Sequence, residues 1–520
     1  MSIMLEQQLK KSLQQNELMA KSLAELTQQL KQVNEELALQ REQNQYLLKQ
    51  LFGRKKESLS PDNSDPNQTD LFENDPSFSW PEQTGDQSAE EIIEVTSTSR
   101  RKKKGYQKEK IAHLPVVEHL YREENCTCPH CTSVMKEMGK EVIREEVVYI
   151  PARLENHRHI RYAYSCQTCE KSGATSIVKA EVPKAPLNGS FASASLIAET
   201  IYQKFQQKVP TYRQESHWKL MNFEIKRTNI SNWHKKTAEY YFEPLVRLMK
   251  KHLLKEDVLH ADETTFKVLD SERTKDYVWL FSSGRYADKK IHIYEHGPSR
   301  SSEVPLAFLK GYRGYLHSDG FSAYGKLIDV SSVACFAHVR RKFYDALPAI
   351  EGEKKSTSRL AVEKCDVIFK KEKELAELSI KERHCKREQF IKPKLDEFFE
   401  WLKTLNPMIK GKIGTAISYA LKQETKVKTV LKDGRLVLTN NLAERGIKSL
   451  VMGRKNWLFA ATTGGARSNA AILSIQETAK ANGLNPRTYF EYLLTHLPNQ
   501  KNIPLEAYLP WASKVQKECC

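Results

Sequence analysis

The sequence lacks long hydrophobic runs and has few cysteines. No stretch of about 18 apolar residues is available to span a bilayer, and the first residues lack the apolar core of a signal peptide. Ten cysteines in 520 residues are too few for a disulfide scaffold. These absences argue against a membrane protein and against a disulfide-rich secreted domain, so we expect a cytoplasmic protein whose paired cysteines bind metal.

One segment lacks positive charge. Residues 58–99 contain ten acidic residues but no Lys or Arg, and they are rich in Asn, Ser and Pro. We interpret them as an acidic, disordered linker. The whole chain nevertheless carries a formal charge of +17, which indicates a polyanionic partner such as double-stranded DNA. Its length suggests about three or four domains.

The N-terminal segment, residues 1–57, has no proline and only one glycine, at position 53. From Leu5 to Leu51, steps of four and three residues select fourteen positions, of which ten are Leu, Met or Val. This repeat predicts a coiled-coil helix through which the chain forms a homo-oligomer. The alternative is a single amphipathic helix that packs against the protein's own body.

Residues 100–185 contain two C-x-x-C pairs, separated by segments at 145–155 and 157–165 that we predict to be strands. Four thiolates in this arrangement suit a tetrahedral, structural Zn²⁺. The predicted ligands are Cys128, Cys131, Cys166 and Cys169. Cys126 and His130 are possible substitutes, and two chance cysteine pairs without metal are the alternative to a zinc module.

Two further segments carry residues suited to DNA binding. A run of five basic residues precedes the zinc module and includes Arg101, Lys102 and Lys103. It is either a solvated tail or, as we expect, a phosphate contact. Residues 186–250 resemble a helix-turn-helix unit with a break at 222–226, although an ordinary helical hairpin gives a similar pattern.

In the second helix of this unit, we expect Thr228 or Ser231 to be the N-cap. The polar residues near its exposed face would then be available to DNA. These are Asn229, Asn232, Lys235 and Lys236.

Three acidic residues occupy distinct local contexts. Asp262 and Asp319 close short apolar runs that predict strands, and Glu444 lies at the start of a predicted helix. The elements after residue 255 read strand, strand, strand, helix, strand, helix, strand, which is the order of the ribonuclease-H-like fold. Asp262 and Asp319 fall on the first and fourth strands. Carboxylates placed in this way can hold hard divalent cations.

The catalytic domain would therefore comprise residues 251–349 and 435–475, with a helical insertion at 350–434 and a small helical tail at 476–520. The fold class is multidomain α+β. Each acid also has an ordinary interpretation: a polar residue at a strand end for Asp262, a turn pair with Gly320 for Asp319, and a first-turn residue of a helix capped by Asn441 for Glu444. The three together favour a site.

Basic residues accompany the acids. Arg340 and Arg341 follow the fifth predicted strand, and we expect them to bind phosphate beside the metal site. Downstream of Glu444 we make the same prediction for Lys448, Arg454 and Lys455, which could instead belong to a solvated face. Cys335 and His338 have two interpretations, packing with a hydrogen bond or a second metal site.

Several strings in this chain, taken in order, resemble the DDE transposases of the insertion-sequence-66 (IS66) family. They are LFGRKKE at 51–57, VPTYRQE at 209–215, HADET at 260–264, HSDGFSAY at 317–324, CFAHVRRKF at 335–343, NNLAERGIK at 440–448 and YLPW at 508–511. The resemblance covers nearly the whole chain.

The resemblance implies a bacterial, nucleoid-associated transposase that binds the ends of a mobile element. It implies cleavage and strand transfer with two Mg²⁺ ions, held by Asp262, Asp319 and Glu444, with Asp262 bridging both. It also suggests that other element-encoded proteins take part. The competing functions are a zinc-dependent DNA-binding regulator without catalysis, and a nuclease of the same fold that does not join strands.

Overall fold

The computed structural model describes five long segments and a few short helical pieces between residues 19 and 40. The segments are 153–165, 177–273, 275–347, 356–405 and 411–520. The acidic linker and the basic run lie outside them, as does most of the predicted coiled coil. The chain divides into two compact units, residues 84–182 and the remainder. Among the described residues, no helix is long and apolar enough to cross a membrane.

The described part of the smaller unit contains one short antiparallel pair, β1 (Ala163–Ser165) with β2 (Ile177–Lys179). The prediction of a strand over 157–165 is wrong for residues 157–162, which form no regular structure. Their side chains are exposed and rich in Arg and His, and Ile160 and Tyr162 are not covered by another element that the structure describes. The predicted strand at 145–155 lies mostly outside the described residues.

From residue 194 the larger unit forms a group of helices that follow one another along the chain. They are α5 (Ala194–Phe205), α6 (Thr211–Leu220), α7 (Arg227–Thr237), the π-helical turn η3 (Ala238–Phe242) and α8 (Glu243–Leu253). A break at residues 221–226 separates α6 from α7, close to the predicted position. The predicted cap is wrong: Lys226 occupies the N-cap without a side-chain bond, and Thr228 and Ser231 lie inside the helix.

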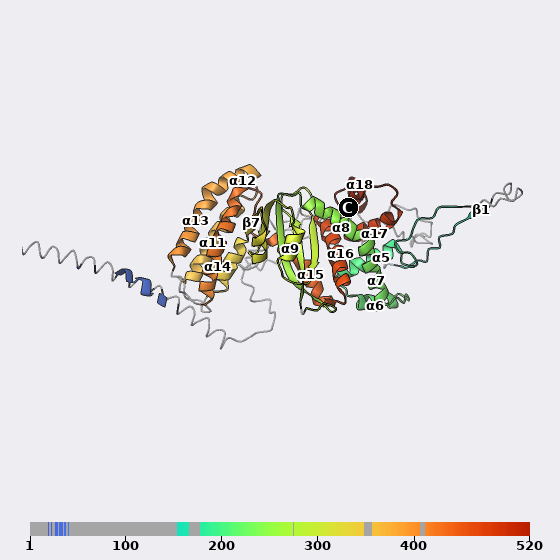
Figure 1. The fold of residues 1–520 in the computed structure, drawn as a ribbon, viewed down its shortest axis with the longest axis horizontal. Helices are drawn as coiled ribbons and strands as arrows, with labels where there is room; N and C mark the ends of the chain where they lie inside the picture. Colours follow the sequence, from blue (N-terminus) through green and yellow to red (C-terminus); the bar gives the residue numbers. More distant parts are fainter. Residues whose placement is uncertain are drawn as a thin grey trace, which may run out of the picture. The chain divides into compact units, whose positions relative to one another are not determined.

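A mixed sheet follows, in the order β5-β4-β3-β6-β7 (Figure 1). Its strands are β3 (Val258–Val268), β4 (Asp276–Ser283), β5 (His292–Gly297), β6 (Gly314–Ser318) and β7 (Val330–Ala334). The first three form an antiparallel meander, whereas β6 and β7 run parallel to β3. Helix α9 (Glu303–Phe308) connects β5 to β6. The two strands that carry Asp262 and Asp319 are therefore neighbours.

Two later helices pack against this sheet. Helix α15 (Asn441–Trp457) contacts β3 and β4, and α16 (Thr463–Ala481) contacts β5. The inner strand β4 is buried along almost its whole length, as expected for a strand covered on both faces. A two-residue strand, β8 (Phe459–Ala460), joins α15 to α16 and pairs in parallel with the end of β3.

The C-terminal helices α17 (Pro486–His496) and α18 (Ser513–Cys519) share one hydrophobic core with the sheet and with α5–α8. Helix α16 also continues without interruption across residue 475, where the sequence analysis places a domain boundary. The predicted helix-turn-helix region, catalytic domain and tail are thus not separate cores in the described chain. Their apolar faces bury one another.

The insertion is helical and has its own hydrophobic core (Figure 1). Its elements are α11 (Thr357–Glu374), α12 (Ile380–Lys386), the π-helical turn η5 (Arg387–Ile391), α13 (Lys392–Thr404) and α14 (Lys412–Lys428). Helix α10 (Phe336–Tyr344), which follows β7, contributes Phe336, Val339 and Phe343 to this core. The sheet and the insertion are therefore packed together through α10.

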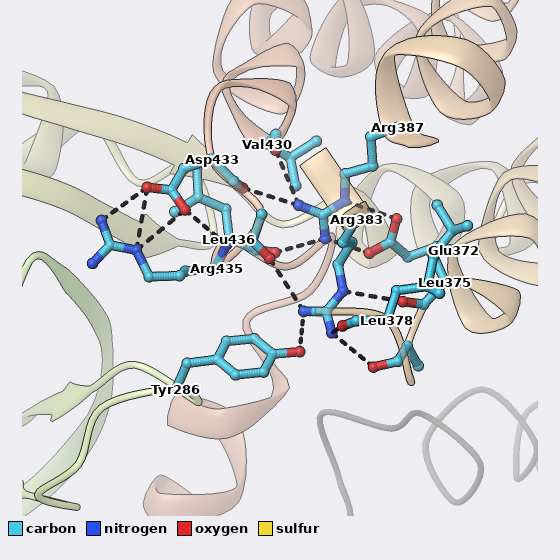
Figure 2. Close-up of polar contacts among 12 residues, drawn as sticks. Tyr286, Glu372, Leu375, Leu378, Arg383, Arg387, Val430, Asp433, Arg435 and Leu436 are labelled. Carbon is cyan, nitrogen blue, oxygen red and sulfur yellow. Dashed lines mark hydrogen bonds and ion pairs between the residues drawn. The ribbon is translucent and has the colours of Figure 1, made fainter. Parts of the chain in front are cut away.

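Two buried arginines fasten the insertion to the segment that returns from it toward α15 (Figure 2). The Arg387 side chain is fully buried and forms an ion pair with Glu372 on α11. Its guanidinium also donates to three carbonyl oxygens of the returning segment, at 2.7 to 3.2 Å. These belong to Val430, Asp433 and Leu436. One side chain thus replaces the backbone partners that this irregular segment lacks.

Arg383 acts in the same way one turn earlier. It donates to the Gly434 carbonyl at 3.1 Å, to Tyr286 near the end of β4, and to three carbonyls in the turn that precedes α12. Gly434 also approaches the backbone so closely that a Cβ atom there would lie 1.9 Å from the Ile380 oxygen. The path of the chain between the insertion and α15 is therefore narrowly fixed.

We predict that Arg387→Ala strongly destabilises the protein, by about 3 to 5 kcal/mol, because it leaves the half-buried Glu372 carboxylate and three carbonyls without this partner. Urea unfolding followed by circular dichroism would measure the loss. The control is Lys392→Ala in α13, which removes only an exposed pair with Glu388 and should leave the midpoint unchanged. Equal midpoints for both variants would contradict this role of Arg387.

Candidate active site

The two aspartates occupy equivalent positions on neighbouring parallel strands. Asp262 lies in β3, and Asp319 directly follows β6. In the β3–β6 pairing His260 is opposite His317, and each aspartate lies two residues beyond its histidine. Because side chains alternate along a strand, both carboxylates are on the face that carries the two imidazoles. The register of the sheet therefore brings the carboxylates together.

His260 and His317 lie side by side on the face of the sheet that carries the aspartates. Their rings stack with centroids 4.3 Å apart and planes 7° from parallel. Burial lowers the pKa of His260 to about 4 and that of His317 well below its ordinary value, so both imidazoles are neutral at pH 7. Sequence reasoning missed this pair, although His-x-Asp occurs in both motifs, HAD at 260–262 and HSD at 317–319.

Asn440 joins the third acid to this histidine pair. Its side-chain oxygen accepts from His260 Nδ1 at 3.0 Å, its side-chain nitrogen donates to the Ala261 carbonyl at 2.9 Å, and its backbone N–H points to Cys335 Sγ at 3.2 Å. Asn440 is also the N-cap of α15, and its carbonyl accepts from the backbone N–H of Glu444 at 3.2 Å. The start of α15 is thus held against β3, with Glu444 in its first turn.

The electrostatics of Asp262 show how close the acids are. Its pKa is raised from 3.8 to about 8, first by burial and then by repulsion from Glu263, Glu444 and Asp319. Carboxylates held together in this way repel one another until a cation compensates them. An all-oxygen ligand set suits a hard divalent ion such as Mg²⁺. The donor chemistry of this group therefore fits a divalent metal.

Glu263, the acid next to Asp262, is bound elsewhere. One of its oxygens accepts from Arg300 Nε and Nη2 at 2.8 and 2.6 Å, and the other accepts from the Tyr324 hydroxyl at 2.8 Å. Arg300 also lies 4.0 Å from the Asp319 carboxylate. With both oxygens in use, Glu263 is a poorer metal ligand than Asp262.

The insertion forms one wall of the site. The Tyr419 hydroxyl on α14 donates to the Asp319 carbonyl at 2.6 Å. Gly320 has a φ of +86°, and a Cβ there would lie 3.0 Å from the Gln423 side chain on the same helix. The turn that presents Asp319 therefore requires glycine, both for its backbone conformation and for the contact with α14.

Cys335 and His338 lie beside Glu444. Ligand-capable atoms of these three residues are all within 4.8 Å of one another, and His338 Nδ1 is 3.7 Å from Glu444 Oε1. The Cys335 thiol, however, is fully buried, contacts the Asn440 N–H, and has a pKa raised to about 12, mainly by burial. A protonated, hydrogen-bonded thiol favours packing over a second metal site.

Two predicted phosphate ligands are turned away from the solvent. Arg340 is 5 % exposed and forms a two-pronged ion pair with Asp366 of α11, at 2.5 and 3.1 Å. Arg454 is half-buried and donates to Thr264 and Thr265 in β3. This packing contradicts the predicted phosphate contact for the buried Arg340, whereas for the half-buried Arg454 the phosphate contact stays a prediction.

The remaining predicted ligands are accessible or lie outside the described residues. Exposed side chains are those of Asn229, Asn232, Lys235, Lys236, Lys448 and Lys455. Arg341 is half-buried. Two groups of predicted ligands fall outside the described residues. They are Arg101, Lys102 and Lys103, and the zinc ligands Cys128, Cys131, Cys166 and Cys169.

Comparison with protein families gives four matches in chain order. They are "Transposase C of IS166 homeodomain" at 39–118, "zinc-finger binding domain of transposase IS66" at 125–170, "Transposase IS66 family" at 189–468 and "IS66 C-terminal element" at 474–511. The third match alone spans more than half of the chain and includes the three acids. These matches imply use of a divalent metal and of zinc.

The chain is also similar to two proteins of Sinorhizobium fredii. Uncharacterized protein y4hP is 27 % identical over 423 residues, which cover 76 % of this chain and 75 % of the relative. Uncharacterized protein y4jD is 25 % identical over 425 residues, which cover 78 % and 81 % of the two chains. With the sheet, the acids and the family matches in agreement, the chain belongs to the IS66 transposase family.

Proposed function

We propose that this chain binds the ends of a mobile DNA element and catalyses metal-dependent cleavage and strand transfer at Asp262, Asp319 and Glu444. The observation that carries the proposal is the register of β3 and β6, which aligns the two aspartates. Asn440 bonds to His260 and Ala261 in β3, which supports a position of Glu444 near the two aspartates although it is distant in the sequence. The strand order and directions support a ribonuclease-H-like catalytic domain.

In this proposal the protein contributes ligands and orientation. Asp262, whose carboxyl is repelled by both other acids, would hold the metal together with Asp319 and Glu444. Two bound Mg²⁺ ions would supply activation of the attacking hydroxyl and stabilisation of the leaving oxygen.

DNA binding is assigned to several surfaces. The exposed polar side chains of α7 and the zinc module would bind the element ends, and the N-terminal coil would bring two or more copies together. The zinc ion would be structural, held by the four cysteines at 128, 131, 166 and 169. Other element-encoded proteins are further candidate partners.

Two other functions remain to be separated by experiment. A nuclease of the same fold would cleave but not join, and a strand-transfer assay with a pre-cleaved 3′-hydroxyl end distinguishes it. A non-catalytic regulator would bind the ends without cleaving them. The convergence of three acids favours catalysis over this second candidate, because repulsion among them raises the free energy of the metal-free fold.

We predict that Asp262→Asn, Asp319→Asn and Glu444→Gln each reduce Mg²⁺-dependent cleavage at least about a thousandfold, because metal ligation supplies several kcal/mol of transition-state stabilisation. Gel-based cleavage and gel-shift assays would show lost cleavage with retained end binding. Glu263→Gln is the matched control, since its side chain is held by Arg300 and Tyr324, and it should lose much less activity. Full cleavage by any triad variant would refute the assignment.

The raised pKa of Asp262 makes a second prediction. The metal-free fold holds this proton with a pKa of about 8, whereas an unfolded aspartate releases it near about 4. The unfolded state therefore binds fewer protons between these values, and the stability of the fold falls as the pH rises through them.

Asp262→Asn removes this charge. In Mg²⁺-free buffer the variant should unfold at a higher temperature than wild type, by a margin that grows between about pH 5 and pH 8. Added Mg²⁺ should narrow the margin, because it stabilises only the wild-type site. Scanning calorimetry measures both effects, and a margin independent of pH would contradict the explanation.

The zinc module makes a third prediction. Elemental analysis of the purified wild type should find about one zinc per chain, and Cys128→Ser combined with Cys131→Ser should remove it. Cys385→Ser, at an exposed cysteine of α12, is the control and should keep its zinc. A wild-type protein without zinc would overturn this part of the proposal.

A further inference from the structure

The exposed face of α15 leads away from Glu444. Glu444 is half-buried in the first turn, and Lys448, Met452 and Lys455 follow it on the same face at helical spacing, all exposed. Met452 is 58 % exposed. The opposite face carries Ala443, Ile447 and Leu450, which are buried against the sheet. One face of α15 thus carries Glu444 and then a row of exposed side chains, Lys448, Met452 and Lys455, which we call the exposed track.

This track ends in exposed apolar side chains. Leu458 and Phe459, directly after α15, are 61 % and 42 % exposed. Phe459 lies in β8 opposite Lys267 of β3, and Leu269, 52 % exposed, is two residues beyond Lys267 on the same side of that strand. Large apolar side chains therefore gather at one end of α15.

Leu458 is held in this exposed position by a strained backbone. Its φ is +57°, a region that is unfavourable for residues with a branched side chain. Its neighbours hold it there: the Leu458 N–H bonds to the Arg454 carbonyl, Trp457 is buried before it, and the Leu269 N–H bonds to the Ala460 carbonyl after it. The side chain points outward because the chain on both sides is fixed.

The charge around the apolar tip selects its partner. Lys267, Lys448 and Lys455 are exposed, and none of them makes an ion pair with another residue that the structure describes. Lys267 and Lys455 lie beside the apolar tip, and Lys448 lies about 15 Å further back along α15. Unpaired positive charges in this arrangement favour a polyanion that also presents an apolar surface. Duplex DNA has both, since phosphates surround stacked bases. A second protein copy would meet the same positive charges.

We propose that α15 lies along the DNA that flanks the cleavage site, and that Leu458 and Phe459 insert at a base step and unstack it. Fourteen residues separate Glu444 from Leu458, which corresponds to about 20 Å of helix and to about six base pairs of duplex. This inference rests on the proposed function and specifies how the same site engages its substrate. Lys448 and Lys455 hold the intervening phosphates.

The geometry suits such insertion. Apolar wedges that enter a base step must stand clear of the protein surface and must not collapse onto it when DNA is absent. The positive φ of Leu458 and the β8–β3 pairing meet both requirements, because the wedge is ordered before DNA arrives. Unstacking bends the duplex and makes the strand near the scissile phosphate easier to deform.

The test compares a wedge variant with a matched control on a duplex that carries the element's terminal sequence. Leu458→Gly combined with Phe459→Ser removes the wedge, and glycine tolerates the positive φ, so the fold is retained. The control is Ile328→Ser, which removes an apolar side chain that is still more exposed and lies before β7, at the end of the sheet away from the acids. Permanganate reactivity of thymines reports unstacking.

Wild type and Ile328→Ser should make thymines reactive at a step about six base pairs from the cleavage site. The wedge variant should lose this reactivity and cleave intact duplex about tenfold more slowly. A mismatch placed at that step, which removes the need for unstacking, should restore its rate. Rescue of this kind would not follow from a merely structural defect.

Other outcomes separate the two proposals. If wild type cleaves in an Asp262-dependent way but the wedge variant behaves like wild type, the wedge inference fails and the proposed function stands. If wild type does not cleave at all, the proposed function fails. If the wedge variant instead changes the oligomeric state measured by light scattering and the mismatch does not rescue it, the apolar tip binds a second copy and the inference is wrong.

Discussion

Three carboxylates of like charge must be held together by a framework that offers them little compensation. The positive groups nearest to them, such as Arg300, are already engaged with Glu263. The restraint comes instead from neutral contacts: the β3–β6 register, the stacked histidines and the Asn440 bridge. Burial and the repulsion among the acids together raise the pKa of Asp262 to about 8. A site of this kind is prepared for cations and is unfavourable without them.

The insertion contributes to the same restraint from a second core. It interrupts the chain between β7 and α15, yet its buried arginines fix the segment that returns to Asn440. Its last helix also contacts the Asp319 turn through Tyr419. The insertion is therefore more than a spacer between Asp319 and Glu444. It sets the directions from which two of the three acids approach Asp262.

Much of the fold could be predicted from local patterns. Alternating apolar residues indicate the strands, and the charged helical stretch after residue 350 indicates the insertion; the structure has strands and helices in these places. The sequence could not show which face of a helix is packed. From the sequence alone, Arg340 and Arg454 are candidate DNA ligands. In the structure, each side chain bonds to a neighbouring element. The predicted helix cap at Asn441 is wrong: Asn440 is the N-cap, and its contacts with β3 could not be predicted from the sequence.

The acids themselves were found because each lies in a distinctive local string, whereas their convergence depends on strand register, which no single segment encodes. His260 and His317 illustrate the difference. Each is unremarkable alone, and their stacking follows only once β3 and β6 are known to be parallel neighbours. Family membership was predictable for the opposite reason, because short strings in a fixed order need no three-dimensional information.

The core shared by α5–α8, the sheet and the C-terminal helices has an evolutionary consequence. Helices that are buried against a catalytic sheet cannot be exchanged between relatives as a cassette, because each exchange would have to preserve that whole interface. Changes in the surface of α6 and α7 must therefore arise by substitution of exposed side chains. Residues 84–182 form a separate unit of the chain, so this constraint does not extend to them.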